Sequence, residues 1–264
     1  MKKSVKNTAA VLLGCAAVIA IWYISAAIIN DEILAPSPKS VMAELFSILG
    51  KKRTYKAING TLLRSITSFF ISFFAAVLLA VPASFSGFVK KAFYPLVALS
   101  RAMPTMSVIL LCLIWLKSSA APVAVSFIVV FPMLYAAVLN ALENRNKRTA
   151  EMLKIYGVSK TKVFFGVTFP DILEKLFPEF VSVFAFNVKL TVSGEAIAYT
   201  RQSLGREMYA ANASFLTGRL MAFTLIAVLL SVALELIVKG IYLAITRGVK
   251  NHARKKSEQK LQVG

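Results

Sequence analysis

Between residues 143 and 179 the chain carries a polar, mostly basic stretch that contains Glu151-Met152-Leu153-Lys154-Ile155-Tyr156-Gly157 and then Val167-Thr168-Phe169-Pro170. Long apolar runs flank this stretch on both sides. Its pattern is a Glu, two apolar residues, a three-residue gap and a Gly, with a Pro thirteen residues after that Gly. The composition from Lys147 to Tyr156 favours a helix, and Gly157 can supply the left-handed residue that ends it. We therefore predict a short helix and a turn between two apolar segments.

The second half of the loop is also helical in pattern. Ser159 is placed to cap a second short helix that carries Val163, Phe164 and Val167 on one face, and we expect this helix to end before Pro170. Two short helices around a glycine make a compact knob that can dock into a groove on another protein. From these residues alone, however, an ordinary solvated linker is the favoured interpretation.

The rest of the chain is strongly apolar. Its 264 residues are 58% hydrophobic, with a mean hydropathy of +0.70, which is too apolar for a soluble globular domain of this length. A run of about 20 apolar residues suffices to cross a bilayer. We predict an all-α integral membrane fold, a single transmembrane domain over residues 1–264, with six spans at about Ala9–Ile29, Leu62–Phe85, Ala92–Leu116, Ala120–Leu142, Phe180–Ala198 and Leu220–Thr246.

The basic residues predict the orientation of these spans. The net charge of +19 does not indicate nucleic-acid binding here, because membrane proteins concentrate Lys and Arg in their cytoplasmic loops. With both termini in the cytosol, the inner segments 1–8, 86–91, 143–179 and the basic tail 247–264 hold more than half of the Lys and Arg residues. We therefore expect a multi-pass protein of the inner or plasma membrane.

A short amphipathic helix is expected before the second span. Ser37 is placed as its N-cap and Pro38 as its first residue, and Val41, Leu45 and Ile48 recur at helical spacing. This helix is expected either to lie on the outer membrane face or to pack against the protein's own spans.

Charged residues also occur inside the predicted spans. Glu235 and Lys239 are four residues apart on one helical face, so an internal pair explains them without any function. A further group has two open interpretations, namely a solute path or the locking of helices, with Arg101 paired to a carboxylate such as Glu195 or Glu235 in the second case. The residues of this group are Arg101, Pro104, Lys189 and Glu195.

The spacing of the loop resembles the EAA loop of ABC importer permeases. That pattern is Glu-Ala-Ala, three residues, Gly, nine residues, a β-branched residue or Leu, one residue, an apolar residue and Pro. The matching positions here are Glu151, Met152, Leu153, Gly157, Val167 and Pro170, with Met152 and Leu153 in place of the two alanines. The resemblance implies that this loop couples the chain to an ATPase made as a separate chain.

Other short motifs are similar, in order and spacing, to the subgroup of nitrate, sulfonate, taurine and pyrimidine-precursor importers. They are Ala35-Pro36-Ser37-Pro38, Arg64, Arg101-Ala102-Met103-Pro104, Ile114-Trp115, Ser193-Gly194-Glu195 and Ser203-Leu204-Gly205. The chain departs from that pattern at Ser203, where the family has Gly, and at Leu116-Lys117, where it has Phe-Gly. The resemblance extends over roughly residues 34–236.

The resemblance implies a permease subunit of a type I ABC importer. Such a subunit forms the path for a small solute. It works in the lipid bilayer as a pair of permeases, here expected to be a homodimer, with ABC ATPase subunits and an extracytoplasmic solute-binding protein. The alternative is a stand-alone secondary transporter, which would need no partner and would use Arg101 and Glu195 directly.

No enzyme constellation is found in the sequence. The single histidine, His252, lies in the basic tail, and no His, Cys and Asp residues stand at metal-ligand spacing. The segment Gly157-Val158-Ser159-Lys160-Thr161 lacks the first Gly of a phosphate-binding loop. We therefore expect no cofactor in this chain and expect ATP to be bound by the partner subunit.

Overall fold

The computed structural model describes residues 2–262, and among these the side chains of all residues except 2–9, 11, 12, 15, 147, 154 and 245–262. Every regular element in the described part is helical. The elements are α1 (Lys2–Ile29), α2 (Pro38–Leu49), α3 (Lys52–Phe85), α4 (Gly87–Ala102), α5 (Thr105–Trp115), α6 (Ala121–Glu143), α7 (Lys147–Ile155), α8 (Lys160–Val163), the π-helical turn η1 (Phe164–Thr168), α9 (Phe169–Ile197), α10 (Leu204–Ala213) and α11 (Thr217–Gln262). The charged side chains expected in the basic tail lie outside the described ones.

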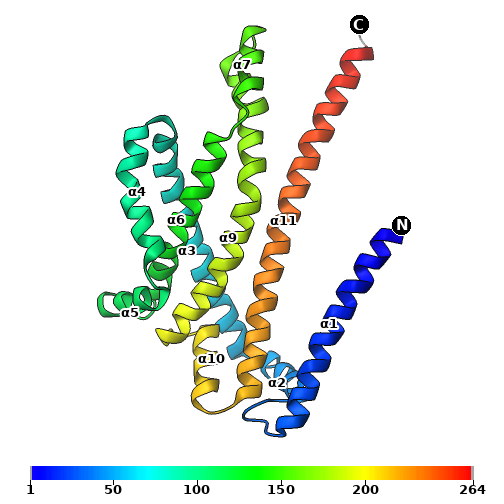
Figure 1. Cartoon of the computed structure of the whole chain (residues 1–264), viewed down its shortest axis with the longest axis vertical. Helices are drawn as coiled ribbons and strands as arrows, with labels where there is room; N and C mark the ends of the chain where they lie inside the picture. Colours follow the sequence, from blue (N-terminus) through cyan, green and yellow to red (C-terminus); the bar gives the residue numbers. More distant parts are fainter. Residues whose placement is uncertain (1, 263–264) are drawn as a thin grey trace.

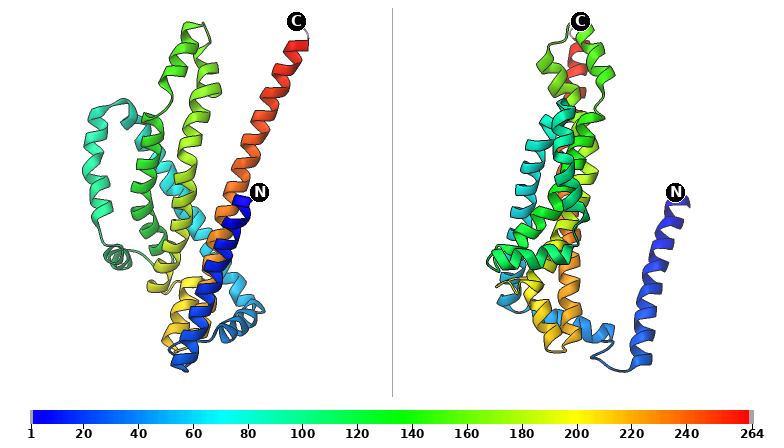
Figure 2. Two further views of the ribbon diagram at one scale, coloured as in Figure 1. Left: turned by 45° about the vertical axis from the view of Figure 1, so that its right-hand side comes forward. Right: turned by 60° about the vertical axis from the view of Figure 1, so that its left-hand side comes forward.

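The long helices α3, α6, α9 and α11 follow the long axis of the molecule, as Figure 1 shows. Helix α7 and the end of α11 lie at one end of the bundle, and α2 and α10 lie at the other. Helix α1 stands apart from the bundle and is joined to it through the segment before α2, which is clearest in the right-hand view of Figure 2. The loop of interest and the α2–α10 region are therefore at opposite ends.

The core is formed where α3, α6 and α9 pack together. Phe69 of α3 is completely buried, and its ring meets the rings of Phe180 and Phe184 of α9 edge-on, with centroids 4.8 Å apart in both pairs. Small polar residues fill the rest of the interface between α3, α6 and α9. Such side chains let membrane helices approach closely and form hydrogen bonds between helices. These completely buried residues are Ser65, Ser68, Ser72, Ser126, Asn187 and Thr191.

Helix α2 packs against the protein's own helices, which is the second of the two expected arrangements. Val41, Leu45 and Ile48 are buried in a cluster that α3, α10 and α11 complete. The start of the helix is as predicted, since the backbone N–H of Ser40 donates to Ser37 Oγ at 3.2 Å and Pro38 is the first helical residue.

Four described helical segments are long and apolar enough to cross a membrane, namely Lys52–Phe85, Ala121–Glu143, Lys160–Ile197 and Thr217–Ala244. A fifth span is obtained if the bent pair α4 and α5 is counted as one, and residues 16–29 of α1 form a shorter apolar helix. The expected count of six and the cytosolic placement of both termini therefore stay predictions.

The expected third span is broken into two helices. Helices α4 and α5 meet at an angle of 99°. Met103 is extended, with ψ of 128°, and Pro104 precedes the first residue of α5. Proline disfavours the helical conformation in the residue before it and lacks an N–H to donate, so the helix ends there and restarts in a new direction.

The second helix of the loop does not end before Pro170, so that prediction is wrong. The turn η1 joins α8 to α9, and the segment Lys160–Ile197 is one continuous helical segment. The N–H of Phe169 donates to Phe164 O, five residues back. This π-type turn accommodates Pro170, whose missing N–H would break an ordinary α-helical bond.

Candidate functional site

The loop between α6 and α9 folds as a compact knob at the end of the bundle. Helix α7 ends at Ile155, and two residues later Gly157 has φ of +75° and is therefore in the left-handed region, as predicted. The N–H of Tyr156 donates to Met152 O at 3.2 Å, and that of Val158 donates to Leu153 O at 3.1 Å. These bonds satisfy carbonyls that the end of a helix leaves free. Ser159 precedes α8 but makes no side-chain capping bond.

The base of the knob is fastened to α9 by a contact that the loop pattern did not reveal. Asp171 Oδ2 accepts hydrogen bonds from the N–H of Asn146, at 2.7 Å, and from Lys175 Nζ, at 2.8 Å. Asn146 Oδ1 in turn accepts from the N–H of Thr149 at 3.1 Å and so caps α7. The ammonium of Lys175 also donates to the carbonyl of Asn144. The loop and α9 are therefore tied together at the start of α7.

The family positions of the loop fall into two groups. Glu151 and Met152 are exposed on α7, and Leu153 is half-buried beneath them. Val167 is half-buried in η1, and Pro170 is exposed at the start of α9. These side chains share one knob, but their coupling role stays a prediction.

The tip of the knob carries large apolar side chains that nothing in the described chain covers. Ile155 is 85% exposed and Tyr156 is 78% exposed, and Phe165 of η1 is also exposed. Large apolar side chains that gather on an exposed surface are typical of interaction sites.

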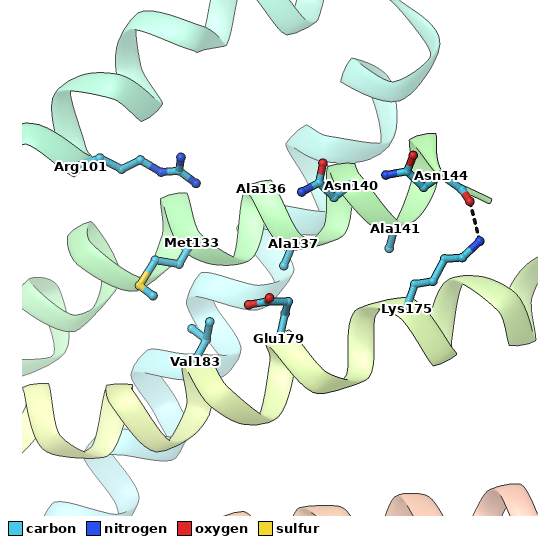
Figure 3. Close-up of a pocket in the computed structure, with 10 residues that line it drawn as sticks. All are labelled: Arg101, Met133, Ala136, Ala137, Asn140, Ala141, Asn144, Lys175, Glu179 and Val183. Carbon is cyan, nitrogen blue, oxygen red and sulfur yellow. Dashed lines mark hydrogen bonds between the residues drawn. The ribbon is translucent and has the colours of Figure 1, made fainter.

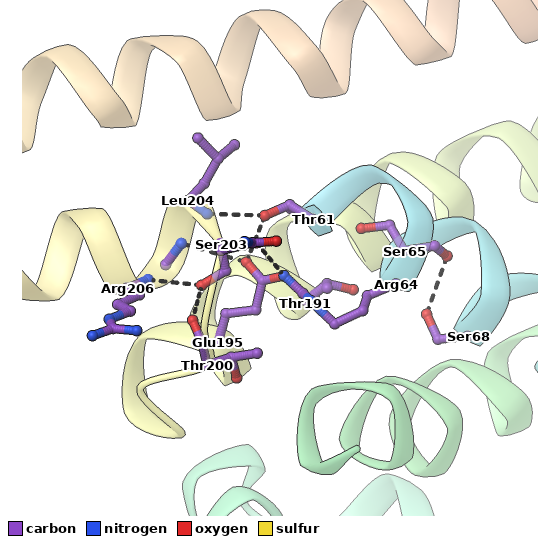
Figure 4. A network of polar contacts seen from close by, with 12 residues as sticks. Thr61, Arg64, Ser65, Ser68, Thr191, Glu195, Thr200, Ser203, Leu204 and Arg206 are labelled. Atoms are coloured by element: carbon purple, nitrogen blue, oxygen red, sulfur yellow. Dashed lines mark hydrogen bonds and ion pairs between the residues drawn. The ribbon is translucent and has the colours of Figure 1, made fainter. Parts of the chain in front are cut away.

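A buried polar network joins α3, α9 and α10 toward the opposite end (Figure 4). Glu195 of α9 is completely buried. Its Oε1 accepts from Arg64 Nε at 2.7 Å, and its Oε2 accepts from Thr61 Oγ1 at 2.7 Å and from the N–H of Gly205 at 3.4 Å. Arg64 also donates to the carbonyl of Gln202 at 2.9 Å. The carboxylate thus has both a charge partner and satisfied oxygens.

Two glycines allow this network to close. A Cβ on Gly205 would lie 2.3 Å from Val192 O and 2.4 Å from Ala196 N, so α10 can approach α9 this closely only with glycine there. A Cβ on Gly60 would lie 2.1 Å from Gln202 O. The partner of Glu195 is therefore Arg64 of α3. Sequence reasoning missed this pairing, although both residues belong to the resembling motifs.

The pairing of Arg101 with Glu195 or Glu235 is not found. Glu195 is held by Arg64, and Glu235 pairs with Lys239 at 2.6 Å, as the four-residue spacing predicted. Arg101 instead donates to the carbonyl of Pro132 at 3.3 Å and faces a cavity between α4, α6 and α9. The reason is geometric, because the break after α4 leaves Arg101 beside the middle of α6.

The other two path candidates lie apart from Arg101. Lys189 is exposed on α9 and makes no ion pair with the described residues. Pro104 is exposed at the corner between α4 and α5. Their roles, in a solute path or in helix locking, stay predictions.

Comparison with known proteins gives a family match over most of the chain. The sequence profile of the family described as binding-protein-dependent transport system inner membrane component matches residues 56–251. The formylaminopyrimidine transport permease protein ThiX of Halalkalibacterium halodurans is 25% identical over 178 residues, which are 67% of this chain and 69% of that protein.

Two further similarities are found. A probable ABC transporter permease protein of Haemophilus influenzae is 24% identical over 203 residues, which are 75% of this chain and 80% of that protein. A chain from the inward-facing MetNI methionine ABC transporter has a TM-score of 0.49 and 14% identity, with 68% of this chain and 94% of that chain covered. The relatives named are permeases and not enzymes. On the family match, this chain belongs to the binding-protein-dependent transport system inner membrane components and is an ABC importer permease.

Proposed function

We propose that two copies of this chain form the translocation path of an ABC importer, and that the knob formed by α7, α8 and η1 receives the movement of an ABC ATPase. The single observation that carries the second part is the exposed apolar tip of the knob. Ile155 and Tyr156 project from the end of a short helix whose base is fixed to α9 through Asp171. Exposed aromatic and aliphatic anchors of this kind are typical of docking surfaces.

The way that the knob continues into the bundle supports a coupling role. Helix α8, the turn η1 and α9 are continuous from Lys160 to Ile197. Helix α9 packs against both α3 and α6 along the core. A push on the tip would therefore be carried along a rigid element into the membrane spans, which is how the closing of a partner can change the access to a path.

The proposed cargo is a small polar solute delivered by an extracytoplasmic binding protein. The family description names a transport system that depends on a binding protein. The relative named as a formylaminopyrimidine permease supports a solute from the nitrate, sulfonate, taurine and pyrimidine-precursor group that the motifs resemble. Binding and hydrolysis of ATP belong to the partner in this proposal.

Recovery of the ATPase partner tests the docking surface. We expect a tagged wild-type chain, purified in mild detergent from its native cells, to bring an ABC ATPase subunit with it. The double change Ile155→Asp and Tyr156→Asp should reduce this recovery at least tenfold, because charged side chains cannot enter an apolar groove. Tyr55→Asp is the control, since Tyr55 is also exposed but lies on α3 at the other end.

The glycine of the turn provides a second test. Gly157→Leu places a side chain where nothing lies within 4 Å, so only the left-handed backbone is strained. This strain is of the order of 1 kcal/mol, and we expect normal membrane insertion with loss of binding-protein-stimulated ATPase activity. Unchanged stimulation, or uptake by the chain alone in liposomes down an ion gradient, would contradict the proposal and favour a secondary transporter.

A further inference from the structure

One cavity of the bundle is lined by charged and polar side chains. It has a volume of about 790 Å³, within the range of small-molecule sites, and is lined by α4, α6 and α9. Arg101, Asn140 and Glu179 supply polar groups to it (Figure 3). The carbonyl that Arg101 contacts belongs to Pro132, near the middle of the Ala121–Glu143 span. The arginine end of the cavity therefore lies about half-way along that span.

Two charges of this cavity have no charged partner in the described part of the chain. The guanidinium of Arg101 makes one hydrogen bond, to the Pro132 carbonyl, and the carboxylate of Glu179 makes none. Lys175, which also borders the cavity, is already occupied by Asp171 and the carbonyl of Asn144. Arg101 lies beside the middle of the Ala121–Glu143 span, and ionisable groups at membrane depth are costly and usually line a path or bind what passes through it.

The cavity has a floor of short side chains between the two charges. Ala136 and Ala137 of α6 leave room there, as Figure 3 shows. Arg101 approaches from α4 on one side of α6, and Glu179 projects from α9 on the other. The carboxamide of Asn140, which can both donate and accept hydrogen bonds, projects from the side of α6 that faces Arg101.

We propose that this cavity is a solute-binding site with two poles, and that it takes small amphoteric solutes. Arg101 receives the anionic or hydrogen-bond-accepting group, and Glu179 receives the cationic or donating group. A purely anionic solute is repelled by Glu179 and a purely cationic one by Arg101, so both kinds bind less well. This inference rests on the proposed function, because it assigns the selectivity of the same path.

The two poles can be measured with charged thiol reagents that do not require the native solute to be known. The background carries Cys15→Ala and Cys112→Ala, and single cysteines replace Met133, which follows the Pro132 that Arg101 contacts, or Ala137, beside Glu179. Membrane vesicles are labelled with 2-sulfonatoethyl or with 2-aminoethyl methanethiosulfonate. We expect the anionic reagent to be favoured at Met133→Cys and the cationic reagent at Ala137→Cys.

Neutralising each pole should move the rates in opposite directions. Arg101→Gln should lower the anionic-to-cationic rate ratio at Met133→Cys roughly tenfold, as for unit charges about 6 Å apart at a water-like dielectric constant near 80, with the rates of the two reagents shifted in opposite directions. Glu179→Gln should raise the ratio at Ala137→Cys. Arg101→Lys keeps the charge and should keep the ratio. Ser159→Cys, in the knob, is the control site whose ratio should not change.

Solute binding is tested by protection against a neutral reagent, methyl methanethiosulfonate. Taurine carries both charges, while ethanesulfonate and ethylamine carry one each. We expect taurine to slow labelling of Ala137→Cys more than either one-ended compound does. The inference is overturned if taurine slows labelling no more than the one-ended compounds do. It is also overturned if Arg101→Gln leaves the anionic-to-cationic rate ratio at Met133→Cys unchanged.

The outcome is separable from that of the proposed function. Substitutions in the cavity lie far from the tip of the knob, so recovery of the ATPase subunit should be unchanged in the same membranes. Loss of ATPase recovery in the unmodified chain would defeat the proposed function and leave the two-pole measurement standing. Preserved recovery with no pole effect would defeat only the inference.

Discussion

Two carboxylates of the same helix, Glu179 and Glu195 of α9, have opposite surroundings. Glu195 is completely buried and receives Arg64, Thr61 and the Gly205 N–H. Glu179 is exposed to a cavity and has no charged partner among the described residues. The first charge is satisfied within the chain, so it fixes how α3, α9 and α10 meet. The second is unsatisfied among the described residues, so it is available to something else.

The largest loss of stability should follow removal of Arg64, the charge partner of Glu195. Arg64→Met leaves the carboxylate of Glu195 buried without its charge partner, and breaking a buried pair in this way costs about 3–5 kcal/mol. We expect a large fall in the melting temperature in detergent. The double change Arg64→Met and Glu195→Leu should recover part of the loss, since it removes the stranded charge. A single variant as stable as the wild type would mean that the network is not what holds these helices together.

A smaller loss of stability is expected where the network around Glu195 leaves room only for a glycine. Gly205→Ala would place a Cβ against the backbone atoms Val192 O and Ala196 N. Overpacking typically costs about 1–3 kcal/mol, and backbone neighbours cannot turn aside. Gly240→Ala is the matched control, because no atom lies within 4 Å of its Cβ position. Equal melting temperatures of the two variants would show that α10 can move away without cost.

The smallest effect on stability is expected at Arg101, which has no charged partner among the described residues. Arg101→Gln removes a guanidinium whose one hydrogen bond is to a carbonyl at 3.3 Å, so the melting temperature should change by the equivalent of less than about 1 kcal/mol. Solute transport should fall while folding is kept. A loss as large as that of Arg64→Met would erase the contrast between the two groups and make Arg101 a structural residue.

Local pattern predicted the features that depend on neighbouring residues. The cap at Ser37, the buried face of α2, the left-handed Gly157 and the pair of Glu235 with Lys239 all follow from spacings of a few residues. They are set by backbone geometry and helical periodicity, which a short sequence contains.

The remaining features depend on contacts between distant segments. Arg64 and Glu195 are separated by 131 positions, and no local rule selects this pairing over one with Arg101. The proline at position 104 is compatible with a break in the third span, but the 99° angle depends on how α5 packs. The same limit applies to η1, because Pro170 was compatible with the end of a helix as well as with a π-type turn.

The turn η1 also sets the rotational phase between the knob and the membrane part of α9. A hydrogen bond to the carbonyl five residues back closes a turn that contains one residue more than an α-helical turn, whose bond reaches four residues back. Deletion of Gly166, which has open space around it, would convert the turn to the α-helical repeat and rotate α8 by about 100° around the axis of α9. Helix α7 could follow this rotation only by breaking the bond between Asn146 and Asp171 that holds its base. The single extra residue therefore allows the knob to continue into α9 and to stay fastened to it at the same time.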